Sequence, residues 1–418
     1  MAQTNFNPWL HRFAVLTALA TLALLGVGGL VTSHGVGMAV PDWPTTYGYN
    51  MFFFPISKWT GGIFYEHSHR LVASTVGILT VLLTRWLGGW NSRRLLVVIG
   101  VTEVLAGLAL SWLMPELKPT GGFLAGIGGV VLLAAAIWVR NQPANRPLPR
   151  MAWLAFWLVQ FQGLLGGLRV VLFKDEIGIF HATLAQVFFA LVSAIALFTS
   201  RWWIRNIPSP LTSLPSNQRG EPRPAGDRKL GRLFLFATIV IFLQLILGAT
   251  MRHQHAGLAI PDFPLAYGKL WPAMDADSIA AYNARRVETT AANPITALQI
   301  GLQMAHRLMA LVILVCVGTV AWRARLKAGL QRLALAWLAL ILVQASLGAW
   351  TIWSNKAADV ATAHVLVGAL SLVTGALGCI IAFRRSTGPV EETALAAASF
   401  VDARGDSFPG NPAAALNQ

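Results

Sequence analysis

Long apolar stretches, separated by short polar or charged segments, run along most of the chain. Many reach the roughly 20 residues that an α-helix needs to cross the hydrocarbon core of a bilayer. The pattern predicts ten membrane-spanning helices, near residues 13–34, 67–88, 94–114, 120–139, 152–172, 178–199, 232–251, 300–322, 330–352 and 361–383. The first stretch is too long for a signal peptide and has no small-residue cleavage site, so it counts as a span.

Composition agrees with an all-α, polytopic membrane protein. The 418 residues are 55% hydrophobic and 12% charged, with a mean hydropathy of +0.59. The net charge of +15 does not indicate nucleic acid, because the basic residues gather at alternate helix ends, as the positive-inside rule requires. With ten spans, this distribution predicts that the N-terminus and the C-terminus both lie in the cytoplasm. Cys316 and Cys379 lie inside apolar stretches and are interpreted as packing residues.

Two halves of the chain share motifs. Gly-Met-Ala-Val-Pro-Asp-Trp-Pro at 37–44 returns as Gly-Leu-Ala-Ile-Pro-Asp-Phe-Pro at 257–264, and Tyr-Gly follows each. A repeat in the same orientation predicts two pseudo-symmetric four-helix bundles related by an axis along the membrane normal. Spans 94–114 and 120–139 lack counterparts, so we interpret them as an inserted pair. The expected domains are an N-terminal half (1–203), a cytoplasmic linker (204–230), a C-terminal half (231–385) and a flexible tail (386–418).

Four histidines are placed alike in these halves. His69, His181, His306 and His364 each lie in the first turns of a span that enters from the outer side. One such histidine is readily explained as a side chain reaching the interface, but two matched pairs favour metal binding. Imidazoles from facing helices suit axial ligation of haem iron. Zinc is less suitable, because only Glu66 offers a third ligand, and only in the first half.

The residue three positions before the first histidine differs between the halves. Glu66 precedes His69, and Gln303 precedes His306, so each shares a helix face with its histidine. Ionisable residues at such depths indicate function by default. A carboxylate can accept or relay protons, which an amide cannot do. The first half is therefore the predicted site of chemistry, and the second half the predicted electron-transfer site.

Three arginines are candidates for contacts with haem propionates, because guanidinium matches carboxylate geometry: Arg70, Arg307 and Arg169. Lipid headgroups are the alternative partners of Arg70 and Arg307. Asp42 and Asp262 are interpreted as caps of turns.

Other histidines receive less specific interpretations. His67 lies about 100° around the helix from its neighbours, which favours an anchor at the interface. His34, His253 and His255 fall in outer loops and receive no role.

With these residues in view, the chain resembles haem A synthases of the mitochondrial and bacterial type. The resemblance covers residues 12–92 and 150–384. It rests on Glu66-x-x-His69-Arg70, the two Pro-Asp-aromatic-Pro loops, Gln162-Gly163 with Gly166 before His181, Met304-x-His306-Arg307, and His364. It implies two pseudo-symmetric four-helix halves and the oxidation of a ring methyl of haem O to the formyl group of haem A. Residues 35–65 lack the cysteine pair that some family members carry.

The resemblance also implies roles for single residues. It assigns His306 and His364 to a bound haem b, His69 and His181 to the substrate haem O, and Glu66 to catalysis. Haem O synthase and an electron-transfer protein are the implied partners, beside the lipid bilayer. No Arg-rich transit peptide precedes the first span, which favours the plasma membrane of a bacterium.

Two other functions remain open at this stage. A dihaem b-type cytochrome that only transfers electrons has no need of a unique carboxylate, so Glu66 opposite Gln303 argues against it. A transporter with duplicated halves is the other alternative. It would usually show broken helices or buried charge at the bilayer midplane, whereas the polar residues here crowd the outer ends.

Overall fold

The computed structural model describes residues 6–139, 147–172, 174–206, 228–285, 294–327 and 329–386. This part of the chain is almost entirely helical, as predicted. The first half contains α1 (Pro8–Ser33), α2 (Gly61–Leu113), α3 (Lys118–Ala136), α4 (Pro147–Leu172), α5 (Asp175–Thr199) and α6 (Arg201–Asn206). The second contains α7 (Arg228–His253), α8 (Ala276–Ala284), α9 (Ala297–Ala324), α10 (Gln331–Trp353) and α11 (Ala358–Ser386). Strands β1 (Thr45–Thr46) and β2 (Tyr49–Asn50) pair antiparallel between α1 and α2.

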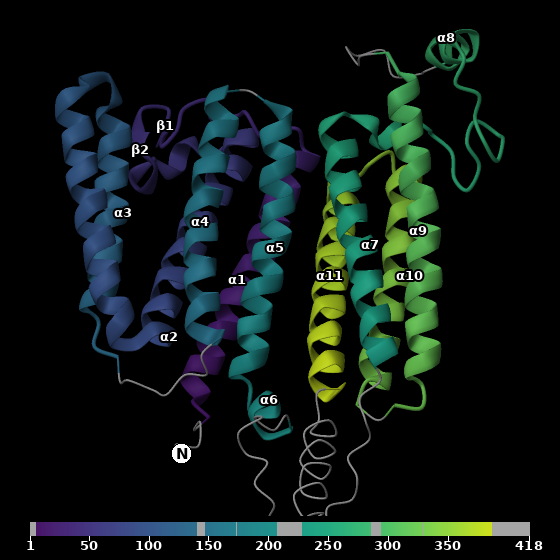
Figure 1. The fold of residues 1–418 in the computed structure, drawn as a ribbon. Helices are drawn as coiled ribbons and strands as arrows, with labels where there is room; N and C mark the ends of the chain where they lie inside the picture. The colour runs from purple at the N-terminus through teal and green to yellow at the C-terminus, as the bar shows by residue number, and fades with distance from the viewer. Residues whose placement is uncertain are drawn as a thin grey trace, which may run out of the picture.

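All ten predicted spans correspond to helices of the structure. Nine helices of the described chain are long and apolar enough to cross a membrane, and one of them, α2, contains both 67–88 and 94–114. α2 changes direction at Gly89, where φ 56° and ψ −141° favour glycine (Figure 1). Arg85 and the Ser92 hydroxyl donate to the Gly89 carbonyl at 3.0 and 2.8 Å. α1 begins and α11 ends on the same side of the molecule (Figure 1).

The two halves lie side by side and share part of their core. α11 packs against α1 and α5, and α7 packs against α5. Ala369 and Val373 of α11 belong to the same buried cluster as residues of α1, α2 and α5. The second half has its own cluster, in which Phe234 and Trp337 stack at 5.3 Å. Most of the expected linker and tail, residues 207–227 and 387–418, lies outside the described residues.

The inserted pair forms a tight hairpin at the edge of the first half (Figure 1). It consists of α3 and the part of α2 that follows Gly89. These two helical segments pack with glycine facing glycine. A methyl group added to Gly107 would lie 2.4 Å from the carbonyl oxygen of Gly121. One added to Gly128 would lie 2.6 Å from the carbonyl oxygen of Gly100. Such close backbone approach is typical of small residues in membrane helices.

A polar contact and an apolar contact attach this hairpin to the bundle. The amide of Gln160 on α4 donates to the carboxylate of Glu103 at 2.9 Å. Leu96 and Val131 of the hairpin are buried against Phe156 of α4 in one cluster. The hairpin therefore lies on one flank of the first half, and its origin as an inserted pair stays a prediction.

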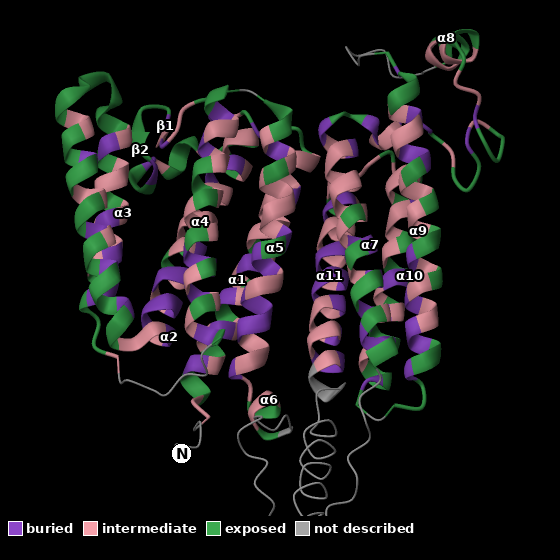
Figure 2. Ribbon diagram, in the orientation of Figure 1, coloured by how far each residue is buried: buried purple, intermediate pink, exposed green. Residues whose placement is uncertain are grey.

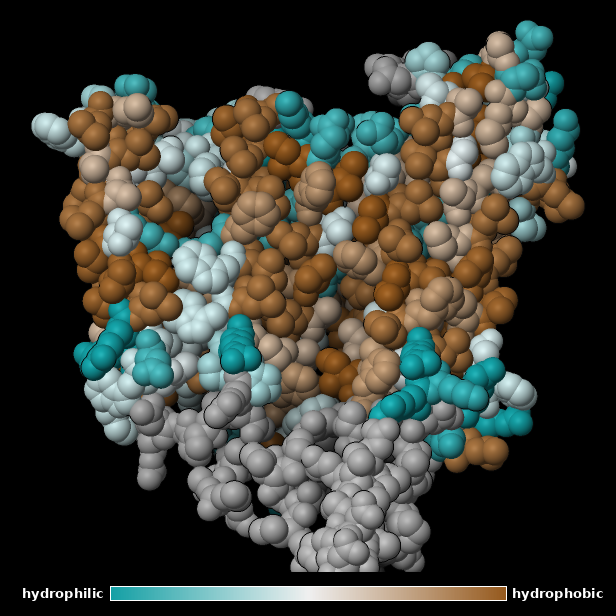
Figure 3. Space-filling model, in the orientation of Figure 1, coloured by the Kyte–Doolittle hydropathy of each residue, from teal (hydrophilic) through white to brown (hydrophobic). Residues whose placement is uncertain are grey.

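Apolar side chains surround the helical part of the molecule. On the face shown in Figure 3, they form a belt between hydrophilic residues at both ends. The exposed faces of the helices (Figure 2) carry residues such as Leu19, Leu133, Leu311 and Val315. Several exposed tryptophans lie at or just beyond helix ends: Trp9, Trp112, Trp138 and Trp353. Tryptophan is enriched where helices leave a membrane, so the whole surface fits a bilayer.

We expect Gly121→Leu to separate the two segments of the inserted hairpin. A methyl group at Gly121 would already lie 2.5 Å from the Gly107 carbonyl oxygen, whereas nothing lies within 4 Å at Gly122. Overpacking of this kind typically costs about 1–3 kcal/mol. Gly121→Leu should lower the thermal unfolding midpoint in detergent, and the matched control Gly122→Leu should leave it unchanged. Equal midpoints for the two variants would contradict this packing.

Candidate functional site

Each of the four predicted ligand histidines rests on a glycine of the preceding membrane-spanning helix. Methyl groups added to Gly28, Gly166, Gly248 and Gly348 would lie 3.0, 3.5, 3.3 and 3.1 Å from Cε1 of His69, His181, His306 and His364, respectively. The contacts join α1 to α2, α4 to α5, α7 to α9 and α10 to α11. Larger residues at these glycines would displace the rings, so close helix packing sets the position of every imidazole.

In the second half the two imidazoles lie near each other. The ring centroids of His306 and His364 are 6.4 Å apart, at an interplanar angle of 54°. An imidazole nitrogen binds a transition metal at about 2 Å, so two rings on opposite sides of one ion have centroids about 6 Å apart. His364 Nδ1 lies 3.1 Å from the carbonyl oxygen of Gln344. This contact favours Nδ1 as the protonated nitrogen. The lone pair is then on Nε2, which faces the side-chain amide nitrogen of Gln344 at 3.3 Å and is the atom that would bind a metal.

The first-half pair is close enough for His181 to act electrostatically on His69. Nδ1 of both rings is buried and has no hydrogen-bond partner among the described residues, and the same is true of His306 Nδ1. Buried polar atoms are normally paired. Three unpaired imidazole nitrogens at equivalent places are compatible with the predicted ligand role of these rings, which stays a prediction; Nε2 of the buried His67 has no partner among the described residues either.

A glutamine four residues before the glycine accompanies three of the four rings. Gln162 and Gln244 donate to the carbonyl oxygens of His181 and His306, at 3.1 and 2.9 Å. Gln344 lies against the His364 ring, with its amide nitrogen 3.3 Å from Nε2. At the fourth ring, His69, the corresponding residue of α1 is Leu24. Sequence reasoning named Gly166 in the motif before His181 but did not predict that a glycine lies against each ring. Gln-x-x-x-Gly before three of the histidines was the available signal.

Glu66 and Gln303 hold the two outer loops in the same way. Glu66 is buried, and one carboxylate oxygen accepts a hydrogen bond from the Val40 N–H at 2.9 Å. The Gln303 side-chain oxygen accepts from the Ile260 N–H at 2.6 Å. Val40 and Ile260 occupy the same position in the repeated loop motif. A carboxylate in one half and an amide in the other therefore perform one structural task.

Arg70 and Arg307 bind the same loops. Arg70 donates to the carbonyls of Val40, Asp42 and Thr45 at 2.7–2.8 Å, and to Glu66 at 2.8 Å. Arg307 donates to the carbonyls of Asp262 and Leu265, at 2.7 and 2.8 Å. Their terminal nitrogens thus serve the loop backbone. Contacts of these two arginines with haem propionates stay a prediction. In the structure both side chains bind the backbone of the outer loops instead.

Asp42 and Asp262 cap the loop turns, as predicted. The Asp262 carboxylate accepts from the N–H groups of Tyr267 and Gly268, at 2.7 and 2.8 Å. That of Asp42 accepts from Tyr47 and Gly48, at 2.8 and 2.9 Å, and from the Thr45 hydroxyl. Burial raises the pKa of Asp42, but these hydrogen bonds outweigh it and hold the pKa below its ordinary value.

Comparisons with known proteins agree with this geometry. Residues 122–376 match the COX15-CtaA family model, described as cytochrome oxidase assembly protein. Heme A synthase of Geobacillus kaustophilus (strain HTA426) is 25% identical over 396 residues, covering 91% of this chain and 94% of the relative. Heme A synthase of Cereibacter sphaeroides (strain ATCC 17025 / ATH 2.4.3) is 28% identical over 389 residues, covering 87% and 84%. That of Shouchella clausii (strain KSM-K16) is 25% identical over 272 residues, covering 65% and 68%.

The chain belongs to the haem A synthase family. Its role therefore lies in haem A biosynthesis. The donor set fits haem better than a metal ion held by protein alone. Among the described residues, no three His, Cys, Asp or Glu side chains come together as a metal site. Paired imidazoles suit an iron that brings its own equatorial ligands.

Two histidines of this haem A synthase homologue lie elsewhere than expected. His67 is not an interface anchor: it is fully buried under the first loop, with Nδ1 3.1 Å from the Thr46 hydroxyl and its ring against Phe54 and Trp59. The loop covers this side of the helix, which periodicity alone does not reveal. His253 is not a loop residue but the buried end of α7, packed on Gly178 of α5.

The third candidate arginine, Arg169, is placed differently from the other two. No hydrogen bond from its guanidinium to another described residue occurs, and its charge acts on both His69 and His181. The carboxylates of Glu66 and Asp175 are within electrostatic reach. Arg169 thus remains the arginine of the first half that can receive an anionic group.

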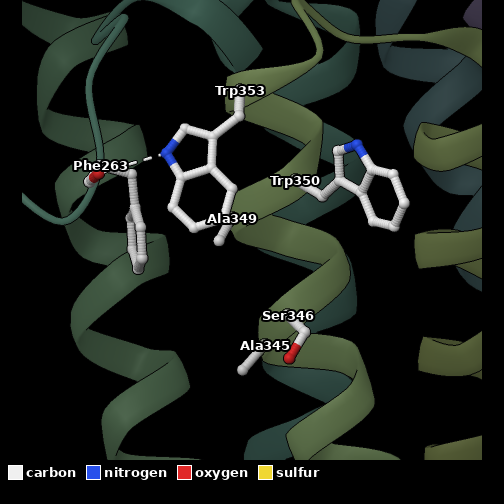
Figure 4. A pocket seen from close by; sticks show the side chains of 6 residues that line it. All are labelled: Phe263, Ala345, Ser346, Ala349, Trp350 and Trp353. Carbon is white, nitrogen blue, oxygen red and sulfur yellow. Dashed lines mark hydrogen bonds between the residues drawn. The ribbon is translucent and has the colours of Figure 1, made fainter.

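An apolar hollow lies between α10 and the second outer loop. It has a volume of about 540 Å³ and is lined by Phe263, Ala345, Ser346, Ala349, Trp350 and Trp353 (Figure 4). The Trp353 indole donates to the Phe263 carbonyl at 3.3 Å, which ties α10 to this loop. The lining contains neither histidine of the second pair and no titratable group.

The equivalence of Glu66 and Gln303 predicts how the first loop responds to substitution. Glu66→Gln should keep the loop in place, because an amide oxygen already accepts the equivalent N–H in the second half. Glu66→Ala leaves the Val40 N–H buried without a partner, at a cost of about 1–3 kcal/mol. We expect faster protease cleavage within residues 36–60 for the alanine variant only. Equal cleavage of both variants and the wild type would show that Glu66 does not hold the loop.

Proposed function

We propose that this protein oxidises a ring methyl of haem O to a formyl group and so produces haem A. The observation that carries the proposal is the two pairs of half-buried histidines, each ring seated on a glycine, inside a bundle of the haem A synthase family. The oxidation adds an oxygen atom and removes electrons and protons. It therefore requires a proton acceptor and a route for electrons beside the site that holds the substrate.

We assign haem b to the second half, with His306 and His364 as its axial ligands. The 6.4 Å ring separation and the Nδ1 contact of His364 support this assignment. Haem b supplies one-electron chemistry when bound. The protein contributes the two rings, each against a glycine, the contacts of Gln344 with the His364 ring, and apolar side chains around them. The bundle has no carboxylate at the place of Glu66, as suits a site for electron transfer only.

We assign haem O to the first half, between His69 and His181. Arg169 would receive an anionic substituent there, because its charge already acts on both rings. Glu66 would accept protons during the oxidation. The loop does not require this charge, since Gln303 holds the second loop without one. Each Glu66 oxygen accepts one hydrogen bond from the protein and keeps a further lone pair for a proton.

The proposal extends to the surroundings of the protein. Its relatives are bacterial and its described helices are apolar enough for many spans, which supports a multi-pass protein of the plasma membrane. We place both termini in the cytoplasm, in line with the basic residues at that end. Haem O synthase and an electron-transfer protein are the proposed partners.

Glu66→Gln tests the chemistry separately from the loop. In cells that supply haem O, we expect this variant to retain haem b and to lose haem A about 100-fold or more, the usual range for a missing proton acceptor. The measurement is chromatography of haems extracted from the purified protein. Wild-type amounts of haem A would remove Glu66 from the reaction. Haem b alone in the wild type would instead identify an electron-transfer cytochrome.

Histidine variants test the assignment of the halves. His306→Ala and His364→Ala should each lower the haem b absorbance, because one axial ligand is lost. His69→Ala and His181→Ala should keep haem b and lose the substrate haem. His255→Asn, in an exposed turn, is the matched control. An unchanged haem b spectrum in His306→Ala would show that the halves are assigned the wrong way round.

A further inference from the structure

Arg252 of α7 is a buried cation without an acidic partner. One terminal nitrogen donates to the Gly29 carbonyl at 2.8 Å and to the Ser33 hydroxyl, both of which belong to α1. Its Nε atom is buried and unpaired among the described residues. No carboxylate of the described chain is among its electrostatic partners. Burying a cation costs several kcal/mol unless an anion or strong hydrogen bonds compensate it, and here the compensation is incomplete.

A second cation lies beside it. Lys356 belongs to the turn between α10 and α11, where its φ of 61° is held by the hydrogen bond from its N–H to the Thr351 carbonyl at 2.7 Å. Burial, and then the charge of Arg252, hold the pKa of Lys356 below its ordinary value. The Lys356 ammonium forms no hydrogen bond with the described residues. Asp359, the next acidic residue along the chain, is exposed and accepts from the Val360 N–H.

Arg252 lies next to the second pair of histidines, and Lys356 lies next to Arg252. Gly248, which carries the His306 ring, is four residues before Arg252, so the two share one face of α7. Arg252 therefore lies one turn, about 6 Å, further toward the outer end of that face. The charge of Arg252 also acts on His364. Two neighbouring positive charges thus repel each other just outside the rings, and no anion of the described chain separates them.

We propose that Arg252 and Lys356 bind the carboxylate substituents of the haem held by His306 and His364. This inference rests on the proposed function of the second half. It replaces Arg307 in that task, because the terminal nitrogens of Arg307 serve the loop carbonyls. Guanidinium and ammonium groups both form charge-assisted hydrogen bonds with carboxylates. An anion placed between them would remove their mutual repulsion and pair the free Nε of Arg252.

Charge-neutral variants test the proposal in the full-length protein. Arg252→Gln and Lys356→Gln should each weaken haem b binding about tenfold, the usual effect of one lost charged hydrogen bond. They should also lower the haem b midpoint potential, because a nearby positive charge favours the reduced iron. The bis-imidazole optical spectrum should persist, since both histidines remain. Lys269→Gln, an exposed charge change in the second outer loop, is the control and should shift neither quantity.

Lys356→Gln keeps the test decisive if Arg252→Gln fails to fold, because Lys356 holds no other described side chain. The inference would be overturned if haem b content and midpoint potential stayed unchanged in two proteins. These are the single variant Lys356→Gln and the double variant that combines Arg252→Lys with Lys356→Gln. Loss of haem b in His306→Ala in the same preparation would show that the proposed function still stands. Wild-type protein without haem b would overturn the proposed function itself.

Haem dimethyl ester, in which both carboxylates are blocked, separates haem from an anionic lipid as the occupant. In a His69→Ala background, which leaves only the second-half pair, we expect haem to bind about 100-fold more tightly than the ester, because the ester loses the contacts of both cations. Lys356→Gln should reduce this preference about tenfold, since Arg252 remains to bind a carboxylate. The proposal would be overturned if the preference for haem over the ester were equal with and without Lys356→Gln. It would be overturned in favour of a lipid headgroup if Lys356→Gln changed haem binding only in vesicles that contain phosphatidylglycerol.

Discussion

The placement of four imidazole rings by helix packing is the constraint on which the rest of this structure depends. In a bilayer there is little hydrophobic force between helices, so van der Waals contact between small residues and the neighbouring helix holds a bundle together. Here the same contacts position the rings, because each lies on a glycine of the preceding span. Interhelical distance and ring position are therefore set together, and a change in one changes the other.

The outer loops add a second constraint, since their backbone groups lie close to the apolar region and must be paired. Arg70 and Arg307 donate to loop carbonyls, and Glu66 and Gln303 accept from loop N–H groups. A buried ion pair such as that of Glu66 and Arg70 adds little net stability, because desolvation offsets the attraction. The second half shows that a neutral amide suffices for this task. Stability alone therefore gives no reason for a carboxylate at Glu66, which is consistent with the proton chemistry that we propose for it.

Sequence reasoning succeeded where periodicity or local turn chemistry decides the structure. Apolar stretches located the ten spans, and the Pro-Asp motifs indicated turns capped by Asp42 and Asp262. It failed where the path of a loop decides. His67 lies on the helix that was predicted for it. Whether its side chain faces lipid or a loop depends on residues 46–59, which fold over it. In the same way, Arg70 donates its hydrogen bonds to carbonyl groups of the first loop, whose positions cannot be predicted from the sequence. Charge type alone did not distinguish this arginine from Arg252, whose position only its hydrogen bonds to Gly29 and Ser33 of α1 reveal.

The halves differ in how firmly they hold their rings. Gln344 contacts the ring of His364, and Gln162 and Gln244 donate to the backbone carbonyls of His181 and His306, whereas Leu24 is the corresponding residue before His69. The second half thus has a glutamine beside both histidines and two neighbouring cations, and the first has a glutamine beside one histidine and a carboxylate. A resident cofactor benefits from rigid ligands, because each immobilised ring lowers the entropy lost on binding. A substrate that must leave after reaction benefits from a weaker hold. The distribution of these side chains therefore matches a resident haem in the second half and a passing one in the first.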